Sequence, residues 1–280
     1  MRTAKNGVEC PDHAGPGDVH MIRSTRFGIF PFWMKKASTL AILSAAIVAA
    51  ISAGAGSISP QPTASDGAEL LVGFRHVEVA SVSDATEKIV GQRMYMSHRM
   101  RPIFPAKFAG FALTVELKKE ENKDPDALNG MLAAIDSGGP NSVYVMKVED
   151  GIDIAGMGGL MGTAMQARNF PGAVIDGGVR DVAYLTKIAF PVYSLGIVPS
   201  TSVNHYRFAG VNTPIVCDGV SVHPGDIVVA DADGVAVVPR ARAADVLATA
   251  QDMDFKEHSM YAYIEKLKSI EEAVKKFGRL

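Results

Sequence analysis

Short apolar runs that alternate with helix-like segments constrain this chain more than any other feature. A continuous run of Val, Ile and Ala is typical of a strand buried on both faces of its sheet. Strands that alternate with helices favour one α/β domain. The sequence predicts helices over 83–94, 125–135, 163–169 and 182–188, and strands over 108–117, 142–148, 173–176 and 191–197.

The last quarter of the chain changes character. Residues 212–239 are short Val/Ile segments separated by Gly, Pro and Asp, which predicts a β-rich meander. Its tight turns are expected at Asp218-Gly219, Pro224-Gly225 and Asp233-Gly234. Residues 241–275 are polar, charged and helix-like. We therefore expect a mixed sheet followed by a C-terminal helical arm.

The N-terminal region has the pattern of a secretory signal. Six basic residues precede an uncharged apolar run over 37–51, and small residues follow it. As a helix, this run would rise about 22 Å, which is shorter than the hydrocarbon core of a bilayer. We predict that residues 1–55 are an N-terminal extension and signal peptide, and that the protein is exported to the periplasm or another extracytoplasmic space. A retained membrane anchor over 37–56, or a cytosolic chain that starts at Met21 or Met34, is the alternative.

Charge and cysteine content narrow the function classes. The 280-residue chain has 28 basic and 30 acidic side chains, and without residues 1–55 it has 22 and 27, a net charge of −5. This balance gives no electrostatic reason to expect nucleic-acid binding. Cys217 would be the one cysteine left, so we expect no intramolecular disulfide and a small buried apolar residue at that position.

A glycine-rich segment, Gly156 to Gly162, precedes the helix expected from Thr163. Free N–H groups at a helix start attract a carboxylate or a phosphate. The segment lacks the spacing of a dinucleotide-binding loop or a P-loop. A turn that needs glycine only for packing is an equally good interpretation.

A second segment with possible chemistry runs from Asp176 to Asp181, at the end of an apolar strand. Ligands of α/β proteins gather at such ends. A carboxylate there can hold a divalent cation, and the neighbouring Arg180 can bind a carboxylate or an enolate oxygen. Alternatively, Asp181 caps the next helix and Arg180 makes an ordinary salt bridge.

Three further carboxylates lie at Asp226, Asp231 and Asp233. They lack the spacing of an EF-hand, so Asp-Gly turns explain them better than a metal site does. The histidines, His205 and His223 among them, show no metal-ligand spacing and are expected to be solvated or packing residues.

The order of these segments resembles the RraA-like family, which contains the regulator of ribonuclease activity A and the 4-hydroxy-4-methyl-2-oxoglutarate aldolases. The resemblance covers 79–280, after a linker over 56–78 that leads into the domain. It implies an α/β sandwich like the swivelling phosphohistidine domain, assembled as a homotrimer or hexamer with clefts between subunits. The segments that carry it are Phe170–Asp181 (FPGAVIDGGVRD), Phe190–Tyr193 (FPVY) and Pro224–Val235 (PGDIVVADADGV).

The resemblance also implies roles for particular residues. Asp181 would bind Mg²⁺ or Mn²⁺, and Arg180 would hold a small 2-oxo acid. Glu257 on the C-terminal arm would be a catalytic residue that reaches a neighbouring subunit. The backbone that would cradle the substrate carboxylate belongs to Gly158, Gly159, Leu160 and Met161.

The chain also departs from the family pattern. Active members carry an acid at the position of Gly159 or at that of Tyr184, and this chain has neither. Asp176 is close enough in sequence to substitute. Two hypotheses follow: a metal-dependent aldolase or decarboxylase acting on a 2-oxo acid such as oxaloacetate or 4-hydroxy-4-methyl-2-oxoglutarate, or a family member without catalysis that binds or regulates.

Overall fold

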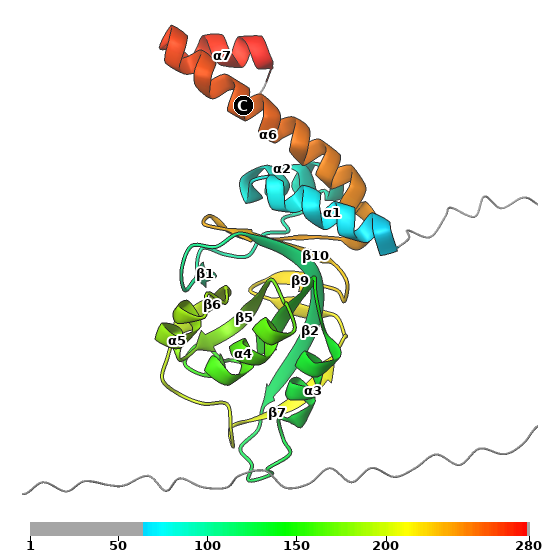
Figure 1. Ribbon diagram of the computed structural model, residues 1–280, viewed down its shortest axis with the longest axis vertical. Coiled ribbons are helices and arrows are strands. Elements are labelled where there is room, and N and C mark those ends of the chain that lie inside the picture. The colour runs from blue at the N-terminus through cyan, green and yellow to red at the C-terminus, as the bar shows by residue number, and fades with distance from the viewer. Residues whose placement is uncertain (1–63, 279–280) are drawn as a thin grey trace, which may run out of the picture. The chain divides into compact units, whose positions relative to one another are not determined.

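The computed structural model describes residues 64–278 (Figure 1). The predicted signal peptide and the alternative membrane anchor therefore lie outside the described residues. Within 64–278, none of the helices is both long and apolar enough to span a membrane.

A mixed sheet of nine strands organises the domain, in the order β1-β6-β5-β3-β2-β10-β11, with β4 added to β5 and β7 added to β2. Strands β2, β3, β5 and β6 run parallel, and β10 pairs antiparallel with β2. The predicted mixed sheet is therefore confirmed. The strands are β1 (Arg101–Pro102), β2 (Phe108–Lys119), β3 (Ser142–Val148), β4 (Ala155–Met157), β5 (Gly172–Val179), β6 (Val192–Ile197), β7 (Tyr206–Val211), β10 (Ile227–Asp231) and β11 (Gly234–Val238).

The central strands are buried on both faces, as their continuous apolar runs predict. In β3, Tyr144 and Met146 pack toward one cluster of apolar side chains, whereas Val143 and Val145 pack toward another. This alternation follows from the two-residue period of a strand. The sheet therefore separates two apolar layers.

Helices α3 (Asn129–Ser137), α4 (Gly159–Ala167) and α5 (Val182–Lys187) contribute to the first layer, and the hairpin of β8 (Ile215–Cys217) and β9 (Val220–Val222) to the second. The hairpin turn has positive φ at both Asp218 (42°) and Gly219 (83°). Two left-handed residues are what a tight two-residue hairpin requires, so the predicted turn is confirmed.

A third apolar cluster joins α1 (Ala64–His76), α2 (Val79–Val90) and α6 (Ala243–Leu267) to the β2, β10 and β11 region. The predicted C-terminal arm is helical, but it consists of α6 and a separate helix, α7 (Ile270–Phe277). Lys268 in the left-handed conformation ends α6, and the Ser269 side chain accepts a hydrogen bond from the Glu272 N–H at the start of α7.

Several predicted helix boundaries are wrong. The helix expected over 83–94 occupies 79–90, because Gly91 adopts a left-handed φ of 79° and ends it. The helix expected over 125–135 occupies 129–137. The segment described as a linker contains α1, whose Leu71 and Phe74 are fully buried. This helix depends on packing against distant α6, which local sequence does not reveal.

Candidate functional site

A cavity of about 360 Å³ lies at the carboxyl ends of the parallel strands β4 and β5. Its walls come from the start of α4, the segment that leads into α3, the residues after β5 and the loop over 201–204. This is the place where α/β sheets commonly bind ligands. Six residues that the sequence singled out line it together: Gly158, Gly159, Leu160, Met161, Arg180 and Asp181.

Asp181 follows β5 in the chain, and its side chain makes a hydrogen bond to the start of α4. Its backbone is left-handed (φ 58°, ψ 32°), a conformation that Asp tolerates better than most residues. Its Oδ2 accepts a hydrogen bond of 2.8 Å from the N–H of Gly159, and its side chain is 49% exposed. Asp181 stands at the start of α5, but its carboxylate makes no capping bond there, so the interpretation as a helix cap is wrong.

Arg180 provides the positive charge of the cavity. Its Nη1 donates to the carbonyl of Ser200 at 3.2 Å, and its Nε lies 3.8 Å from Asp181 Oδ2. The guanidinium is partly exposed and is anchored from one side, so the remaining N–H groups can bind a ligand carboxylate.

The start of α4 supplies backbone donors. The helix begins at Gly159, four residues before the position that the sequence predicted. The N–H of Gly159 is occupied by Asp181, which corrects the predicted four-residue cradle. The N–H groups of Leu160 and Met161 find no acceptor within the described chain, as expected for the first turn of a helix.

Gly158 must be glycine for this arrangement. A Cβ at that position would lie 2.5 Å from Asp181 Oδ2 and 3.0 Å from Arg180 Cγ. Both distances are shorter than ordinary van der Waals contact. The glycine-rich segment is therefore needed where the helix start meets the Arg180–Asp181 pair.

Neither of the two positions at which the family resemblance implies an acid, Gly159 and Tyr184, carries one in this chain. A Cβ on Gly159 would lie 3.0 Å from Cδ1 of Tyr184, so the tyrosine ring lies beside the place where an acid would stand. The Tyr184 hydroxyl lies 3.3 Å from Thr163 Oγ1, within α4. Among residues 64–278, no three His, Cys, Asp or Glu side chains form a group that could hold a metal ion.

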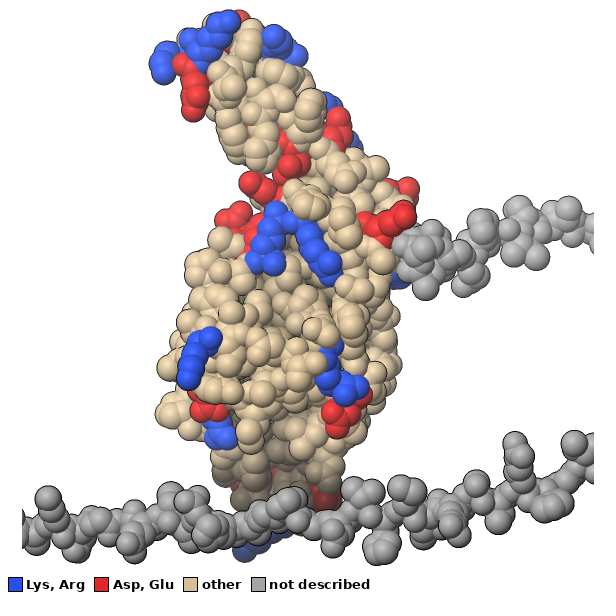
Figure 2. Space-filling model, viewed as in Figure 1, with Lys and Arg blue, Asp and Glu red and all other residues tan. Residues whose placement is uncertain are grey.

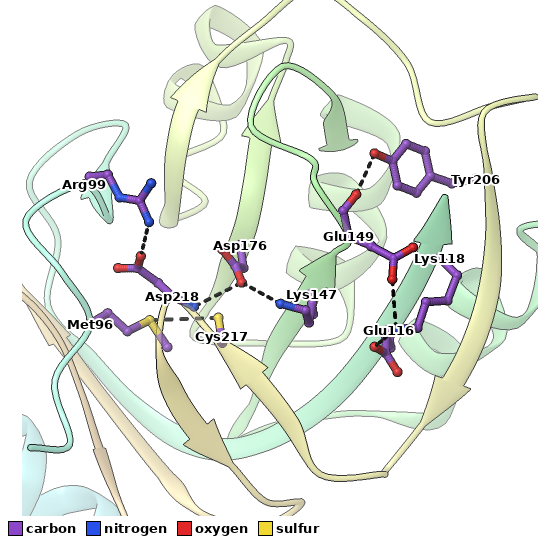
Figure 3. Close-up of polar contacts among 10 residues, drawn as sticks. All are labelled: Met96, Arg99, Glu116, Lys118, Lys147, Glu149, Asp176, Tyr206, Cys217 and Asp218. Carbon is purple, nitrogen blue, oxygen red and sulfur yellow. Dashed lines mark hydrogen bonds and ion pairs between the residues drawn. The ribbon is translucent and has the colours of Figure 1, made fainter. Parts of the chain in front are cut away.

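Asp176 does not replace the missing acids. Its Oδ2 accepts the N–H of Asp218 at 3.0 Å and lies 3.5 Å from Lys147 Nζ (Figure 3). The side chain is 12% exposed and does not line the cavity. Asp176 therefore ties β5 to β3 and to the β8–β9 hairpin.

Glu257 lies on α6, where its Oε1 accepts a hydrogen bond of 2.8 Å from the Tyr261 hydroxyl. It does not line the cavity of its own chain. Its predicted role in a neighbouring subunit stays a prediction.

Sequence reasoning missed the part of the cavity wall that comes from α3 and the segment before it. Asp124 and Leu128 line the cavity from the segment that leads into α3, and Met131 lines it from α3 itself. Asp124 pairs with Arg207 at 2.8 Å, and this partner lowers the pKa of the carboxyl. The one feature of the sequence that could have pointed to this wall is Asp124 immediately before Pro125. That pair predicts the start of a helix and does not indicate a binding site.

The remaining carboxylates organise turns, as predicted. Asp226 is buried and accepts the N–H groups of His223 (2.8 Å) and Arg240 (3.0 Å). Asp231 accepts the N–H groups of Val79 and Asp233.

Cys217 is fully buried, and burial raises the pKa of its thiol. The expectation of a small buried apolar residue is confirmed, and such a thiol is unreactive.

Comparison with known proteins decides the family. A sequence profile described as "RraA-like: Aldolase/RraA" matches residues 79–237, more than half of the chain. The chain belongs to the RraA-like family. The match begins at the residue predicted as the start of the domain.

Several known proteins are similar to this RraA-like chain in sequence or in fold. A protein of Halalkalibacterium halodurans named "Putative 4-hydroxy-4-methyl-2-oxoglutarate aldolase" is 26% identical over 184 residues, which are 65% of this chain and 82% of the relative. An uncharacterized protein from Pseudomonas syringae pv. tomato shares the fold with a TM-score of 0.68 and 27% identity, over 77% of this chain and 96% of the other. Streptomyces coelicolor RraAS2, described as an unusual member of the RNase ES inhibitor RraA family, has a TM-score of 0.61 and 24% identity, over 71% and 97%.

Proposed function

We propose that this protein is a divalent-metal-dependent lyase that cleaves a carbon–carbon bond in a small 2-oxo acid, as an aldolase or a decarboxylase. The observation that carries the proposal is the convergence of Arg180, Asp181 and the α4 start on one cavity. A relative named for aldolase activity supports the class of reaction. Oxaloacetate and 4-hydroxy-4-methyl-2-oxoglutarate are the first substrates to test.

The donor set fits Mg²⁺ or Mn²⁺ held by one carboxylate. Asp181 Oδ2 is engaged by Gly159, whereas Oδ1 contacts no donor in the described part of the chain. Mg²⁺ keeps several waters and is commonly held by one or two carboxylates, so Asp181 with water is a sufficient ligand set. A metal bound there would act as a Lewis acid on the 2-oxo group.

Other groups in and near the cavity would bind and orient the substrate and move the proton. Arg180 would bind the substrate carboxylate and stabilise the enolate oxygen that develops during cleavage. The N–H groups of Leu160 and Met161 would orient the same carboxylate from the helix start. Glu257 from a neighbouring subunit of a homotrimer or hexamer would move the proton, as the family resemblance implies.

A second candidate is a family member that binds its ligand without turnover. Gly159 and Tyr184 favour it, because Gly159 has no side chain and Tyr184 lacks the carboxylate with which an acid would hold metal-bound water. Such a protein would still bind a 2-oxo acid through Arg180.

The deciding assay measures pyruvate released from oxaloacetate and from 4-hydroxy-4-methyl-2-oxoglutarate, with Mg²⁺ or Mn²⁺ and with EDTA. Asp181→Asn keeps a residue that tolerates the left-handed backbone and removes the charge. We expect EDTA and Asp181→Asn to abolish turnover. Asp245→Asn, an exposed carboxylate on α6, is the matched control and should remain active.

Turnover that survives both EDTA and Asp181→Asn would refute metal-dependent cleavage. Ligand binding without turnover in the wild type would favour the second candidate.

The remaining expectations, from the N-terminal sequence pattern and from the family resemblance, are part of the proposal. We propose export to an extracytoplasmic space, a swivelling phosphohistidine-like sandwich and a trimeric or hexameric assembly. A mature N-terminus near Gly56, read by mass spectrometry of the expressed protein, would support export; an intact cytosolic chain would contradict it. Light scattering measures the assembly.

A further inference from the structure

The guanidinium of Arg180 is held by a residue that lies outside the cavity. Its Nη1 donates to the carbonyl of Ser200 at 3.2 Å, and Ser200 does not line the cavity. We propose that Ser200 is a positioning residue, whose hydroxyl fixes this carbonyl and thereby orients the Arg180 guanidinium toward a ligand carboxylate. This inference rests on the proposed function, in which Arg180 binds the carboxylate of a 2-oxo acid, and it adds a residue to that site.

The Ser200 hydroxyl joins the loop after β6 to the segment that enters β4. Its Oγ donates to the carbonyl of Asp153 at 2.8 Å and accepts a hydrogen bond of 3.0 Å from the N–H of Ala155. Ala155 is the first residue of β4, and all three residues of this strand line the cavity. The hydroxyl therefore uses both its donor and its acceptor capacity on one wall of the cavity.

Backbone hydrogen bonds do not hold the chain at Ser200. Strand β6 ends at Ile197, and the N–H of Val198 still donates to the carbonyl of Val179 at 3.0 Å. In the described part of the chain, residues 199–201 make no hydrogen bond to another backbone group. Pro199 has no N–H to donate. The Ser200 side chain is therefore what fixes the position of the Ser200 carbonyl.

The same strand also fixes the backbone of Arg180. The N–H of Arg180 donates to the carbonyl of Met157, the last residue of β4, at 3.1 Å. Ser200 is bound to Ala155 at the beginning of β4, and the Arg180 guanidinium is bound to Ser200. These contacts close a ring through β4, Arg180 and Ser200, so the guanidinium is fixed at both ends of its side chain.

The direction of this guanidinium matters because the cavity has few positive charges. Arg180 is the one Lys or Arg among the residues that line it, and the metal proposed at Asp181 would be the other positive charge. Charged side chains of the described residues are sparse and scattered over the face shown in Figure 2, so long-range attraction of an anion to that face is weak. A planar guanidinium binds a carboxylate well only when its N–H groups point at the oxygens.

Binding of pyruvate, a product of the proposed reaction, tests the inference without turnover. Calorimetry with Mg²⁺ should show that Ser200→Ala binds pyruvate about 10-fold more weakly than the wild type, because the guanidinium loses its fixed direction. Ser200→Thr keeps the hydroxyl and should restore the affinity. Ser137→Ala is the matched control: its hydroxyl also donates to a backbone carbonyl at 2.8 Å, but it lies outside the cavity, and the variant should bind as the wild type does.

Mn²⁺ added without pyruvate separates positioning from general disruption. Ser200 makes no hydrogen bond to Asp181 in the described chain, so Ser200→Ala should bind Mn²⁺ as the wild type does. Joint loss of Mn²⁺ and pyruvate binding in Ser200→Ala would overturn the inference. Equal pyruvate binding by Ser200→Ala and the wild type, no restoration by Ser200→Thr, or no pyruvate binding by the wild type would also overturn it.

The NMR signal of the Arg180 Nε–H gives a readout that needs no ligand. The signal is identified by its loss in Arg180→Lys, and it reports how firmly the guanidinium is held. In Ser200→Ala it should move toward the signals of exposed arginines and exchange faster with water, whereas in Ser200→Thr it should stay in place. An Arg180 signal that is the same in Ser200→Ala and in the wild type would contradict a positioning role.

Turnover distinguishes this inference from the lyase proposal. If no 2-oxo acid is cleaved but Ser200→Ala still weakens pyruvate binding, the lyase proposal fails and the role of Ser200 stands. If the wild type cleaves oxaloacetate and Ser200→Ala does so with the same KM, the lyase proposal stands and the role of Ser200 is wrong. A raised KM in Ser200→Ala, restored in Ser200→Thr, supports both.

Discussion

Replacing Asp176 with alanine should destabilise the fold and leave the cavity functional. The substitution removes an ionised acceptor from the N–H of Asp218 (3.0 Å), an interaction worth about 1.5–3 kcal/mol. It also removes the ion pair with Lys147, whose side chain is 29% exposed, for at most about 1 kcal/mol more. The expected loss is about 2–4 kcal/mol, or a Tm lower by about 4–16 °C for a domain of this size.

Urea unfolding and thermal melts measure this loss directly. Asp252→Ala removes a carboxylate from an exposed ion pair with Lys256 on α6 and should change stability by less than about 0.5 kcal/mol. Equal stability of the two variants would refute the reasoning. If Asp176→Ala folds normally but no longer binds Mn²⁺, Asp176 is a metal ligand and its assignment to the fold is wrong.

Three further predictions concern other parts of the molecule. Gly158→Ala should displace the Asp181 carboxylate and weaken Mn²⁺ binding about 10-fold or more, whereas Gly139→Ala, with open space around its Cβ, should not; calorimetry compares the two. Cys217 should react with a thiol reagent only after denaturant is added, because it is buried and its pKa is raised; fast labelling of the native protein would contradict this. His258 has a raised pKa, first through its hydrogen bond to the backbone of Asp254 and then through nearby carboxylates, so its stabilising effect should be complete below its unfolded-state pKa and vanish as pH rises through the folded-state value. His258→Gln should therefore lower Tm at pH 5.5 and not at pH 8.5.

The strands were predictable because their signal is local. The continuous apolar run before Asp176 marks a strand buried on both faces, and it appears as β5. The Asp218-Gly219 turn was predictable for a similar reason, since few residue pairs tolerate two left-handed conformations.

Helix boundaries were less predictable. Glycine is a poor helix former, so the start of α4 at Gly159 has no strong local signal. It is stabilised instead by the Asp181 carboxylate, twenty-two residues away. Helix α1 was missed because its buried side chains pack against α6, which lies far along the chain.

The sequence alone placed Arg180 and Asp181 at the end of a strand and a glycine-rich segment before a helix. It left open whether Asp176 joins Asp181 in the site. Tertiary structure decided this: the β5–β6 register shifts between Ile175 and Gly178, and Asp181 adopts a left-handed backbone that brings its carboxylate to Gly159. The direction of a side chain depends on strand pairing and backbone conformation, and both are set by contacts between residues that are distant in sequence.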